Sequence, residues 1–446
     1  MNRSFPVLAA GFAGQLHAVS MTNSPLWIFP ALPLLFFALQ KSKPKDAPAL
    51  GALYAAFAGV EVVAAQSYGF FAIALMFANR ILFGIGLGFV LAFVARRVRG
   101  MMSAFISAFA LVAWEQIFRV STGTFYVPVS IGNALAGNEL FSQMAGIGGA
   151  PLLSLLLSFF GCSLLLAVSQ TSRLMAAVHL WVALLVPASM ALYGWVQLHS
   201  STAAGEAFSK PEPMRVRIVQ GAVPTWTYEM LPFVPAIEDE ILEHYTALSK
   251  APAGDEKPDL IVWPESVLRP SHRSQPRVFE KVRDLARKLS TWFIVGSAFY
   301  ESGDSAPLNG ALSVSPSGSL DRGAKRWLLP LLEDEWKADD QPVIFESAGR
   351  RIGVVICVES VYPVLFNDFA GQQLDLIVVL VNDAGLGPGG REVHARRSSL
   401  RAIEMGVPVI HAAQHFDTRV FDSHGIEIAR ATKSGAQNID VTIPLF

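Results

Sequence analysis

The chain has 446 residues, which is longer than one ordinary domain and predicts at least two units. Hydrophobic residues make up 52% of it and charged residues only 16%, with a mean hydropathy of +0.41, so the composition is more apolar than soluble globular proteins usually have and favours a membrane protein. The net charge of -1, without any long basic run, argues against a nucleic-acid partner.

The first 198 residues are a series of long apolar runs, each close to the roughly 20 residues that a helix needs to cross a bilayer. We predict a membrane domain over residues 1–198 with about seven transmembrane helices, at 5–21, 25–40, 48–66, 70–95, 101–120, 151–170 and 174–198. A small, polar, Pro-containing segment at 199–213 predicts a linker, and residues 214–446 are predicted to form a catalytic domain.

Basic residues occupy every second loop between the predicted spans. They precede the first span and follow the second, fourth and sixth, as Arg3, then Lys41, Lys43 and Lys45, then Arg96, Arg97 and Arg99, and finally Arg173. Because Lys and Arg accumulate in cytoplasmic loops, the N-terminus is predicted to be cytoplasmic, and seven crossings put the chain after Leu198 on the external side.

Charged residues also occur inside the apolar runs, where an ionised group is costly unless it is paired or lines a cavity. Glu115 and Arg119 lie one helical turn apart. Two interpretations stay open for them, an i,i+4 ion pair near a membrane interface or contact with a lipid headgroup. Cys162 is interpreted as a small apolar residue that faces lipid or a neighbouring helix.

After the linker, short apolar runs rich in β-branched residues alternate with amphipathic stretches, a pattern typical of α/β domains. The runs LIVW, GVVIC and LIVVLV lack polar alternation, as expected of strands buried on both faces. Helices are predicted near 236–249, 276–289, 361–369 and 391–405. A hairpin, RVFDSHGIEIAR, is the last predicted element.

Two reactive side chains follow buried strands, where catalytic groups of α/β folds tend to lie. Glu265 follows LIVWP, and Cys357 follows RIGVVI. Taken singly, Glu265 has the simpler interpretation of a solvated carboxylate, Cys357 of a small buried residue, and Lys325 of a surface lysine.

The three side chains together form a more specific set, because a thiol needs a base or a positive neighbour to act as a nucleophile near neutral pH. A carboxylate can accept the thiol proton, and a lysine ammonium can stabilise the oxyanion that forms when a carbonyl is attacked. This chemistry requires neither a metal nor a cofactor. His411 and His415 lie four apart without an acidic or Cys partner at ligand spacing, so no metal site is expected.

These segments resemble the carbon–nitrogen hydrolase, or nitrilase, superfamily, whose catalytic triad appears in the chain order Glu, Lys, Cys. Glu265 stands in a W-P-E context, and Cys357 stands in an I-C-x-E context with Glu359 two residues on. Lys325 and Glu333 match the K-x-x-L-V-P-x-x-E spacing of the membrane-anchored branch, the apolipoprotein N-acyltransferases. Further agreement comes from Gln220 and Gly221, from the pair Asn382 and Asp383, from His394 and from the run 401–404.

The resemblance implies a multi-span α-helical membrane domain followed by an α/β domain, a nitrilase-like αββα sandwich, in the inner membrane of a bacterium with the catalytic domain in the periplasm. Glu265 is then the general base, Cys357 the nucleophile and Lys325 the oxyanion stabiliser, with Glu333 and Glu359 as supporting carboxylates. The expected substrate-binding residues are Asn382, Asp383, His394, Trp226 and Trp327, although core or interface packing also explains the two tryptophans.

The implied reaction takes an acyl chain from a phospholipid, holds it as a Cys357 thioester and passes it to an amine, such as the N-terminus of an apolipoprotein. The expected partners are therefore the membrane, a phospholipid donor and a lipoprotein or other amine acceptor. Two alternatives remain open. One is a membrane-tethered amidase or acyltransferase with a different acceptor, linked to plasmid conjugal transfer, and the other is a non-catalytic scaffold.

Several departures from the acyltransferase pattern loosen the assignment of the substrate. Val358 stands where those enzymes usually have Tyr, and Gly385 and Leu386 replace two large apolar residues. Residues 414–416, Gln-His-Phe, replace an N-N-G stretch, and only 32 positions (357 − 325) separate Lys325 from Cys357. No closing membrane span is expected before the end of the chain. The combination resembles the TraB-type conjugal-transfer subgroup.

Overall fold

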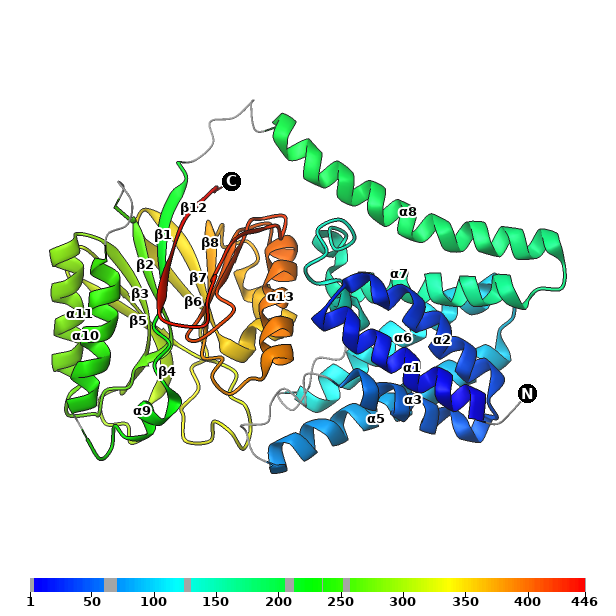
Figure 1. Cartoon of the computed structure of the whole chain (residues 1–446), viewed down its shortest axis with the longest axis horizontal. Helices are drawn as coiled ribbons and strands as arrows, with labels where there is room; N and C mark the ends of the chain where they lie inside the picture. Colours follow the sequence, from blue (N-terminus) through cyan, green and yellow to red (C-terminus); the bar gives the residue numbers. More distant parts are fainter. Residues whose placement is uncertain are drawn as a thin grey trace. The chain divides into compact units, whose positions relative to one another are not determined.

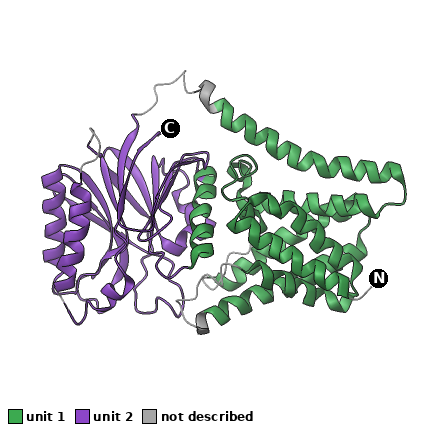
Figure 2. Ribbon diagram, in the orientation of Figure 1, with its two compact units in different colours: residues 1–206, 387–404 green, residues 207–386, 405–446 purple. Residues whose placement is uncertain are grey.

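The computed structural model describes residues 4–59, 70–123, 130–204, 212–234, 236–251 and 257–445. The chain separates into two compact units, a helical unit 1 (Met1–Glu206 with Gly387–Glu404) and an α/β unit 2 (Ala207–Leu386 with Met405–Phe446), drawn in Figures 1 and 2. Helix α8 (Arg173–Ala204) continues into the predicted linker, of which residues 205–211 lie outside the described residues.

Helices lie in each of the predicted apolar runs of unit 1, within the residues that the structure describes. Their bounds are α1 (Ser4–Thr22), α2 (Ile28–Lys41), α3 (Ala47–Ala58), α5 (Phe70–Arg97), α6 (Met101–Thr122), α7 (Ala145–Ser169) and α8. Within the described residues, four stretches are long and apolar enough to cross a membrane: Ile73–Arg97, Met101–Thr122, Ala145–Ser169 and Arg173–Ser200.

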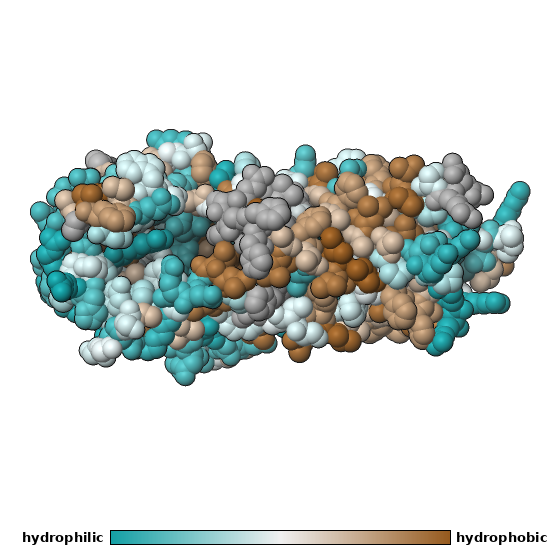
Figure 3. Space-filling model, turned by 90° about the horizontal axis from the view of Figure 1, so that it is seen from below, coloured by the Kyte–Doolittle hydropathy of each residue, from teal (hydrophilic) through white to brown (hydrophobic). Residues whose placement is uncertain are grey.

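Large apolar side chains stay exposed on these helices, among them Leu82, Phe89, Trp181 and Leu185. The face of unit 1 seen in Figure 3 carries broad apolar areas, whereas unit 2 is mainly hydrophilic in the same view. Such exposure suits contact with lipid, and the chain is a membrane protein. The other three predicted crossings stay predictions, and residues 60–69, which include the end of the third, lie outside the described residues.

Helices α3 and α5 pack closely through glycine. A Cβ atom added to Gly51 would lie 2.0 Å from the carbonyl oxygen of Gly84, and one added to Gly88 would lie 2.2 Å from that of Ala47. Small residues four apart, such as Gly84 and Gly88, let two membrane helices approach until their backbones touch, which increases van der Waals contact where no hydrophobic driving force between helices exists.

The contacts of Glu115 differ from both contacts that the sequence suggested for it, with Arg119 or with a lipid headgroup. Its fully buried carboxylate accepts hydrogen bonds from the backbone N–H of Ile131 (2.8 Å) and from the hydroxyls of Ser130 and Ser154 (both 3.2 Å). Arg119 donates instead to the Gln116 side chain (3.1 Å). Neither the predicted ion pair nor contact with a lipid headgroup describes Glu115, which anchors the short helix η5 (Ile131–Leu135).

Helix α13 (Pro388–Met405) belongs to unit 1 although it follows residues of unit 2 in the chain. The Ser399 hydroxyl accepts a hydrogen bond from the backbone N–H of Gly137 (3.0 Å), and the Glu404 carboxylate accepts one from that of Ala150 (3.1 Å). The second contact lies beside a kink in α7, where Gly149 has a φ of +64°. Side chains of α13 therefore satisfy backbone groups that the kink and the loop leave exposed.

Unit 2 contains two six-stranded sheets. The first has the order β12-β1-β2-β3-β4-β5, with β1 (Met214–Gln220), β2 (Leu260–Leu268), β3 (Trp292–Phe299), β4 (Leu308–Val314), β5 (Leu320–Ala324) and β12 (Gln437–Ile443). The second has the order β11-β10-β9-β8-β7-β6, with β6 (Val343–Ser347), β7 (Arg350–Ile356), β8 (Leu376–Val381), β9 (Val409–Ala413), β10 (Arg419–Phe421) and β11 (Glu427–Arg430). Strands β1–β3 and β7–β9 run parallel within their sheets.

The two sheets pack face to face, as the sandwich prediction requires. Alternate residues of β2 point to different cores, because Val262 packs between the sheets while Trp263 packs under the helices. Those helices are α10 (Ala236–Lys250) and α11 (Gln275–Leu289), which cover the outer face of the first sheet (Figure 1). The prediction of an α/β sandwich after a helical membrane region is confirmed.

Two strands of the first sheet were not predicted. Strand β5 has one buried residue out of five, and β12 alternates polar and apolar residues with only two of its seven residues buried. Neither strand therefore has the apolar run that marks a buried strand. Strand β12 pairs antiparallel with β1, from Met214 opposite Ile443 to Gln220 opposite Gln437. The predicted hairpin β10–β11 is therefore not the last element of the fold.

Candidate active site

Glu265 lies inside strand β2, whereas the sequence predicted it at the strand end. The pairing of β2 with β3 shifts register between Trp263 and Leu268, and Ser266 has a φ of +53°. Pro264 has no N–H to donate to the ladder, which favours a bulge at this point. Gly296 on β3 permits the close approach, because an added Cβ would lie 1.9 Å from the Pro264 carbonyl oxygen.

Both carboxylate oxygens of Glu265 are held by hydrogen bonds. Oε1 accepts a hydrogen bond from the Asn309 amide (2.8 Å), and Oε2 accepts one from the backbone N–H of Asn382 (2.8 Å). The side chain is only 6% exposed. Two fixed donors hold the carboxylate in one orientation within the sandwich.

Lys325 follows strand β5 and is almost fully buried. Its Nζ lies 2.6 Å from Glu333 Oε1 and 4.0 Å from Glu265 Oε1. Burial by itself lowers the pKa of Lys325, but the charges of Glu333 and Glu265 outweigh it and hold the pKa above the ordinary lysine value. The side chain is therefore an ammonium group between two carboxylates.

Glu333 also shapes the segment that follows Lys325. Its Oε2 accepts a hydrogen bond from the backbone N–H of Leu329 (2.7 Å), while the backbone N–H of Glu333 donates to the Leu329 carbonyl (2.9 Å). The K-x-x-L-L-P-x-x-E spacing thus corresponds to a loop whose last residue, Glu333, contacts its first residue, Lys325.

Cys357 lies at the turn between strand β7 and the short helix η6 (Cys357–Val361). Its φ of +52° is unusual for a residue with a side chain, and such backbone strain often marks a functional side chain beyond a strand end. Burial raises the pKa of the Cys357 thiol well above its ordinary value. The Glu265 charge and a hydrogen bond to Glu265 add to this increase, while the Lys325 ammonium opposes it. At neutral pH the thiol is protonated beside Glu265.

Glu359 links the two segments that carry Lys325 and Cys357. Its Oε1 accepts hydrogen bonds from the backbone N–H groups of Arg326 (2.8 Å) and Trp327 (3.1 Å), and its Oε2 accepts one from Ile356 (3.0 Å). Burial raises the pKa of this carboxyl, and the three N–H donors act against that increase. Glu359 is therefore a positioning residue for the turn of Cys357.

Replacing Glu359 with Ala is expected to destabilise unit 2, because each buried N–H left without an acceptor costs about 1–3 kcal/mol. Thermal unfolding of the purified chain measures the change. Glu346→Ala is the control, since that carboxylate is 71% exposed and pairs with Arg351 on the surface. An unchanged melting temperature for Glu359→Ala would contradict the positioning role.

Asn382 and Asp383 hold loops at the end of strand β8. The Asn382 side chain accepts a hydrogen bond from the backbone N–H of Ala384 (3.3 Å). The buried Asp383 carboxylate accepts one from each of the backbone N–H groups of His415 and Phe416 (both 2.9 Å). These contacts orient the backbone that reaches Glu265, and substrate binding by the two side chains stays a prediction.

The remaining predicted substrate-binding residues are spread over the fold. Trp327 is half-buried against Tyr362, with ring centroids 5.0 Å apart. Trp226 lies on helix α9 (Thr225–Glu229) and is 63% exposed. His394 is buried on α13, within unit 1. Their roles in binding substrate stay predictions.

Asn309 is a residue of the site that the sequence interpretation missed. It stands in a strand whose seven residues are all buried, and a buried amide is expected to have a hydrogen-bond partner. Its side-chain amide donates to Glu265, and its backbone carbonyl oxygen accepts a hydrogen bond from the backbone N–H of Lys325 (2.8 Å). The polar residue inside the run LNGALSV was the available signal.

Comparison with known proteins identifies the family to which the chain is similar. Residues 215–445, just over half of the chain, match the model of the carbon-nitrogen hydrolase family. An apolipoprotein N-acyltransferase of Geobacter metallireducens is 28% identical over 52% of this chain and 47% of its own length. One of Rhizobium meliloti is 25% identical over 81% of this chain and 71% of its own length. The chain thus spans about half the length of the first of these relatives.

Solved structures also match about half of the chain. A CN-hydrolase superfamily protein from Xanthomonas campestris is 21% identical, with a TM-score of 0.42, over 52% of this chain and 91% of that protein. The family match extends over unit 2 from β1 to the end of β12 and includes Glu265, Lys325 and Cys357. On that match, the chain belongs to the carbon-nitrogen hydrolase family.

Proposed function

We propose that this chain is an N-acyltransferase that moves an acyl chain from a phospholipid, through a thioester on Cys357, to an amine such as the N-terminus of an apolipoprotein. The observation that carries the proposal is the buried cluster of Glu265, Lys325 and Cys357, in which a protonated thiol neighbours a fixed carboxylate and an ammonium group. Metal is not needed for this chemistry.

In the first half-reaction Cys357 Sγ attacks the ester carbonyl carbon of the phospholipid, and the thiol proton moves to Glu265. The carbonyl oxygen becomes an oxyanion, which the Lys325 ammonium stabilises by a charged hydrogen bond. The C–O ester bond then breaks, and the leaving alkoxide of the lysophospholipid takes the proton from Glu265. The acyl group remains on Cys357 as a thioester.

In the second half-reaction the acceptor amine attacks the thioester carbonyl, and Glu265 accepts the amine proton. When the C–S bond breaks, the proton returns to the Cys357 sulfur and the amide product leaves. Glu265 thus alternates between base and acid, as a ping-pong reaction requires.

A lipid donor is favoured by the apolar surface of both units. The four long apolar helices support a membrane location, and the segment that begins at α9 exposes Trp226, Met230, Phe233 and Val234. The names of the relatives favour an apolipoprotein acceptor. The basic loops favour a cytoplasmic N-terminus in a bacterial inner membrane, with a catalytic domain of about residues 214–446 outside it.

A different amine acceptor, or an amide substrate, is the second candidate. Val358 follows Cys357 in the sequence, and Gly385 stands two residues after Asp383. Both are smaller than the aromatic residues that the acyltransferase pattern has there. A pocket altered at these positions would keep the donor half-reaction while changing the acceptor. The third candidate, a non-catalytic scaffold, requires the cluster to be inert.

Mass spectrometry of the Cys357 peptide, after incubation of the purified chain with phosphatidylethanolamine, tests the donor half-reaction. The expected result is an acyl adduct that hydroxylamine removes in wild type and that Cys357→Ala lacks, while the Cys162 peptide stays unmodified. A wild-type chain that gains no adduct, under conditions in which an apolipoprotein N-acyltransferase does, would refute the proposal. Adding a diacylated lipopeptide with a free N-terminal amine then tests the acceptor, through loss of the adduct and gain of an amide.

A further inference from the structure

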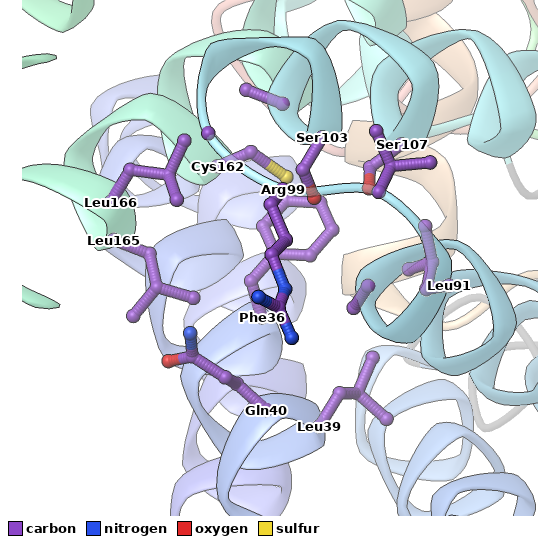
Figure 4. Close-up of a pocket in the computed structure, with 14 residues that line it drawn as sticks. Phe36, Leu39, Gln40, Leu91, Arg99, Ser103, Ser107, Cys162, Leu165 and Leu166 are labelled. Atoms are coloured by element: carbon purple, nitrogen blue, oxygen red, sulfur yellow. The ribbon is translucent and has the colours of Figure 1, made fainter.

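A cavity of about 180 Å³ lies at one end of unit 1, where α2, α5 and α7 end and α6 begins (Figure 4). Its walls are mostly apolar and include Phe36, Leu39, Leu91 and Leu165. Its polar lining consists of the exposed side chains of Gln40 and Arg99 and the hydroxyls of Ser103 and Ser107. An apolar cavity of this size can hold a group comparable to benzene, or a short stretch of acyl chain.

Arg99 is the charged residue of this cavity. Its side chain extends among the lining residues in Figure 4, with Gln40 on one side and Leu91 on the other in that view. Over the described ranges of the chain, Arg99 has no carboxylate partner. A guanidinium at the mouth of an apolar cavity therefore offers a site for an anion that carries an apolar group.

The surroundings of the cavity are also positive. Lys41 ends α2, Arg96 and Arg97 end α5, and Arg173 begins α8 directly after α7. Gly100 precedes α6, and no side chain caps the first turn of that helix, whose N–H groups carry partial positive charge. Anionic lipid headgroups collect at such basic ends of membrane helices.

We infer that this cavity binds an anionic phospholipid, with the phosphate on Arg99 and the first turn of α6 and part of an acyl chain against the apolar walls. A free phosphate would leave those walls empty, and a zwitterionic lipid such as phosphatidylcholine would bring a cationic choline group to these basic helix ends. Residues of unit 1 alone form this site, which is separate from the cluster of Glu265, Lys325 and Cys357 in unit 2.

Native mass spectrometry of the full chain in detergent, titrated with phosphatidylglycerol or phosphatidylcholine, tests the inference. Arg99→Gln is the test variant. Arg96→Gln is the matched control, because it removes the same charge from the same helix end without touching the cavity. Wild type is expected to retain phosphatidylglycerol in preference to phosphatidylcholine. Arg99→Gln should weaken phosphatidylglycerol binding about tenfold, the effect of one lost charged hydrogen bond, and Arg96→Gln, which removes only part of the surrounding positive charge, should weaken it clearly less.

Two further measurements distinguish binding of the whole lipid from binding of its phosphate group alone. Ser103→Phe fills the cavity from α6 and is expected to weaken binding of phosphatidylglycerol, and glycerol 3-phosphate is expected not to displace the lipid. Retention of phosphatidylglycerol by Arg99→Gln at the wild-type level would overturn the inference, as would an equal loss in Arg96→Gln or displacement by glycerol 3-phosphate. If Ser103→Phe fails to fold, the Arg99 comparison still decides.

Discussion

Glu265→Gln is expected to slow acylation of Cys357 by about 10²–10⁴-fold while it speeds alkylation of the same thiol by iodoacetamide. The two effects have opposite signs because Glu265 acts on the thiol in two ways. As a base it takes the proton when a carbonyl is attacked, and as a buried negative charge it disfavours a thiolate in the resting enzyme.

The pH dependence gives the sign of the second effect. Burial and then the Glu265 charge raise the pKa of Cys357 well above its ordinary value, so wild-type alkylation should keep rising with pH beyond the usual range for a thiol. Removing the Glu265 charge takes away one influence that raises the pKa of Cys357. Burial still raises this pKa and the Lys325 charge still lowers it, so the pKa should be lower in the variant than in wild type. The Gln variant should therefore reach a given alkylation rate at a lower pH than wild type.

Peptide mass spectrometry of iodoacetamide labelling between about pH 6 and 10 measures these rates, with the Cys162 peptide as an internal reference. Glu280→Gln is the control substitution, because that exposed carboxylate pairs with Arg283 far from the thiol in the sequence. If alkylation and acylation fall together in Glu265→Gln, Glu265 activates the thiol before substrate binds, and the mechanism proposed above is wrong.

The cluster of Glu265, Lys325 and Cys357 could be predicted from the sequence because each of its members stands in a short local pattern. Trp263-Pro264-Glu265 and the Cys357 and Glu359 pair are both contiguous segments, and the loop between Lys325 and Glu333 has a fixed length. Their convergence depends on the packing of two sheets, which no local pattern reports. Asn309 was missed for the same reason, since its partner Glu265 lies 44 positions away.

Other parts of the fold differ from the prediction where contacts between distant segments outweigh local composition. Strand β12 has a polar, alternating sequence, yet its backbone pairs along the whole of β1. The bulge at Glu265 arises from Pro264 and from the close approach of Gly296, and only the first of these is adjacent in sequence. Apolar runs near 20 residues indicated the four helices that are long enough to cross a membrane, because such a run is itself the signal.

Lys325→Met is expected to abolish most acylation and also to destabilise unit 2. Loss of an oxyanion donor costs about 10²–10³-fold in rate. Removing one partner of a buried ion pair costs about 3–5 kcal/mol, because Glu333 and Glu265 are then left without their positive neighbour. The pKa of Cys357 should rise further, since the Lys325 charge is the main influence that lowers it.

A double variant separates these two roles. In Lys325→Met with Glu333→Gln the buried carboxylate is removed together with the ammonium, so much of the lost stability should return. Activity should not return, because the ammonium that is proposed to stabilise the oxyanion is still missing. Lys337→Met provides the control, since that lysine is exposed and its pairs with Glu301 and Asp304 lie at the surface.

Thermal unfolding and the rate of adduct formation on Cys357 are measured for wild type, Lys325→Met, the double variant and Lys337→Met. If the double variant recovers both stability and acylation, Lys325 serves only to neutralise Glu333, and the oxyanion must be stabilised by another donor. If it recovers stability alone, the ammonium acts on the reacting carbonyl. The second result is expected, because Lys325 stays protonated beside two carboxylates and a charged donor in a buried site binds an oxyanion more strongly than a neutral one.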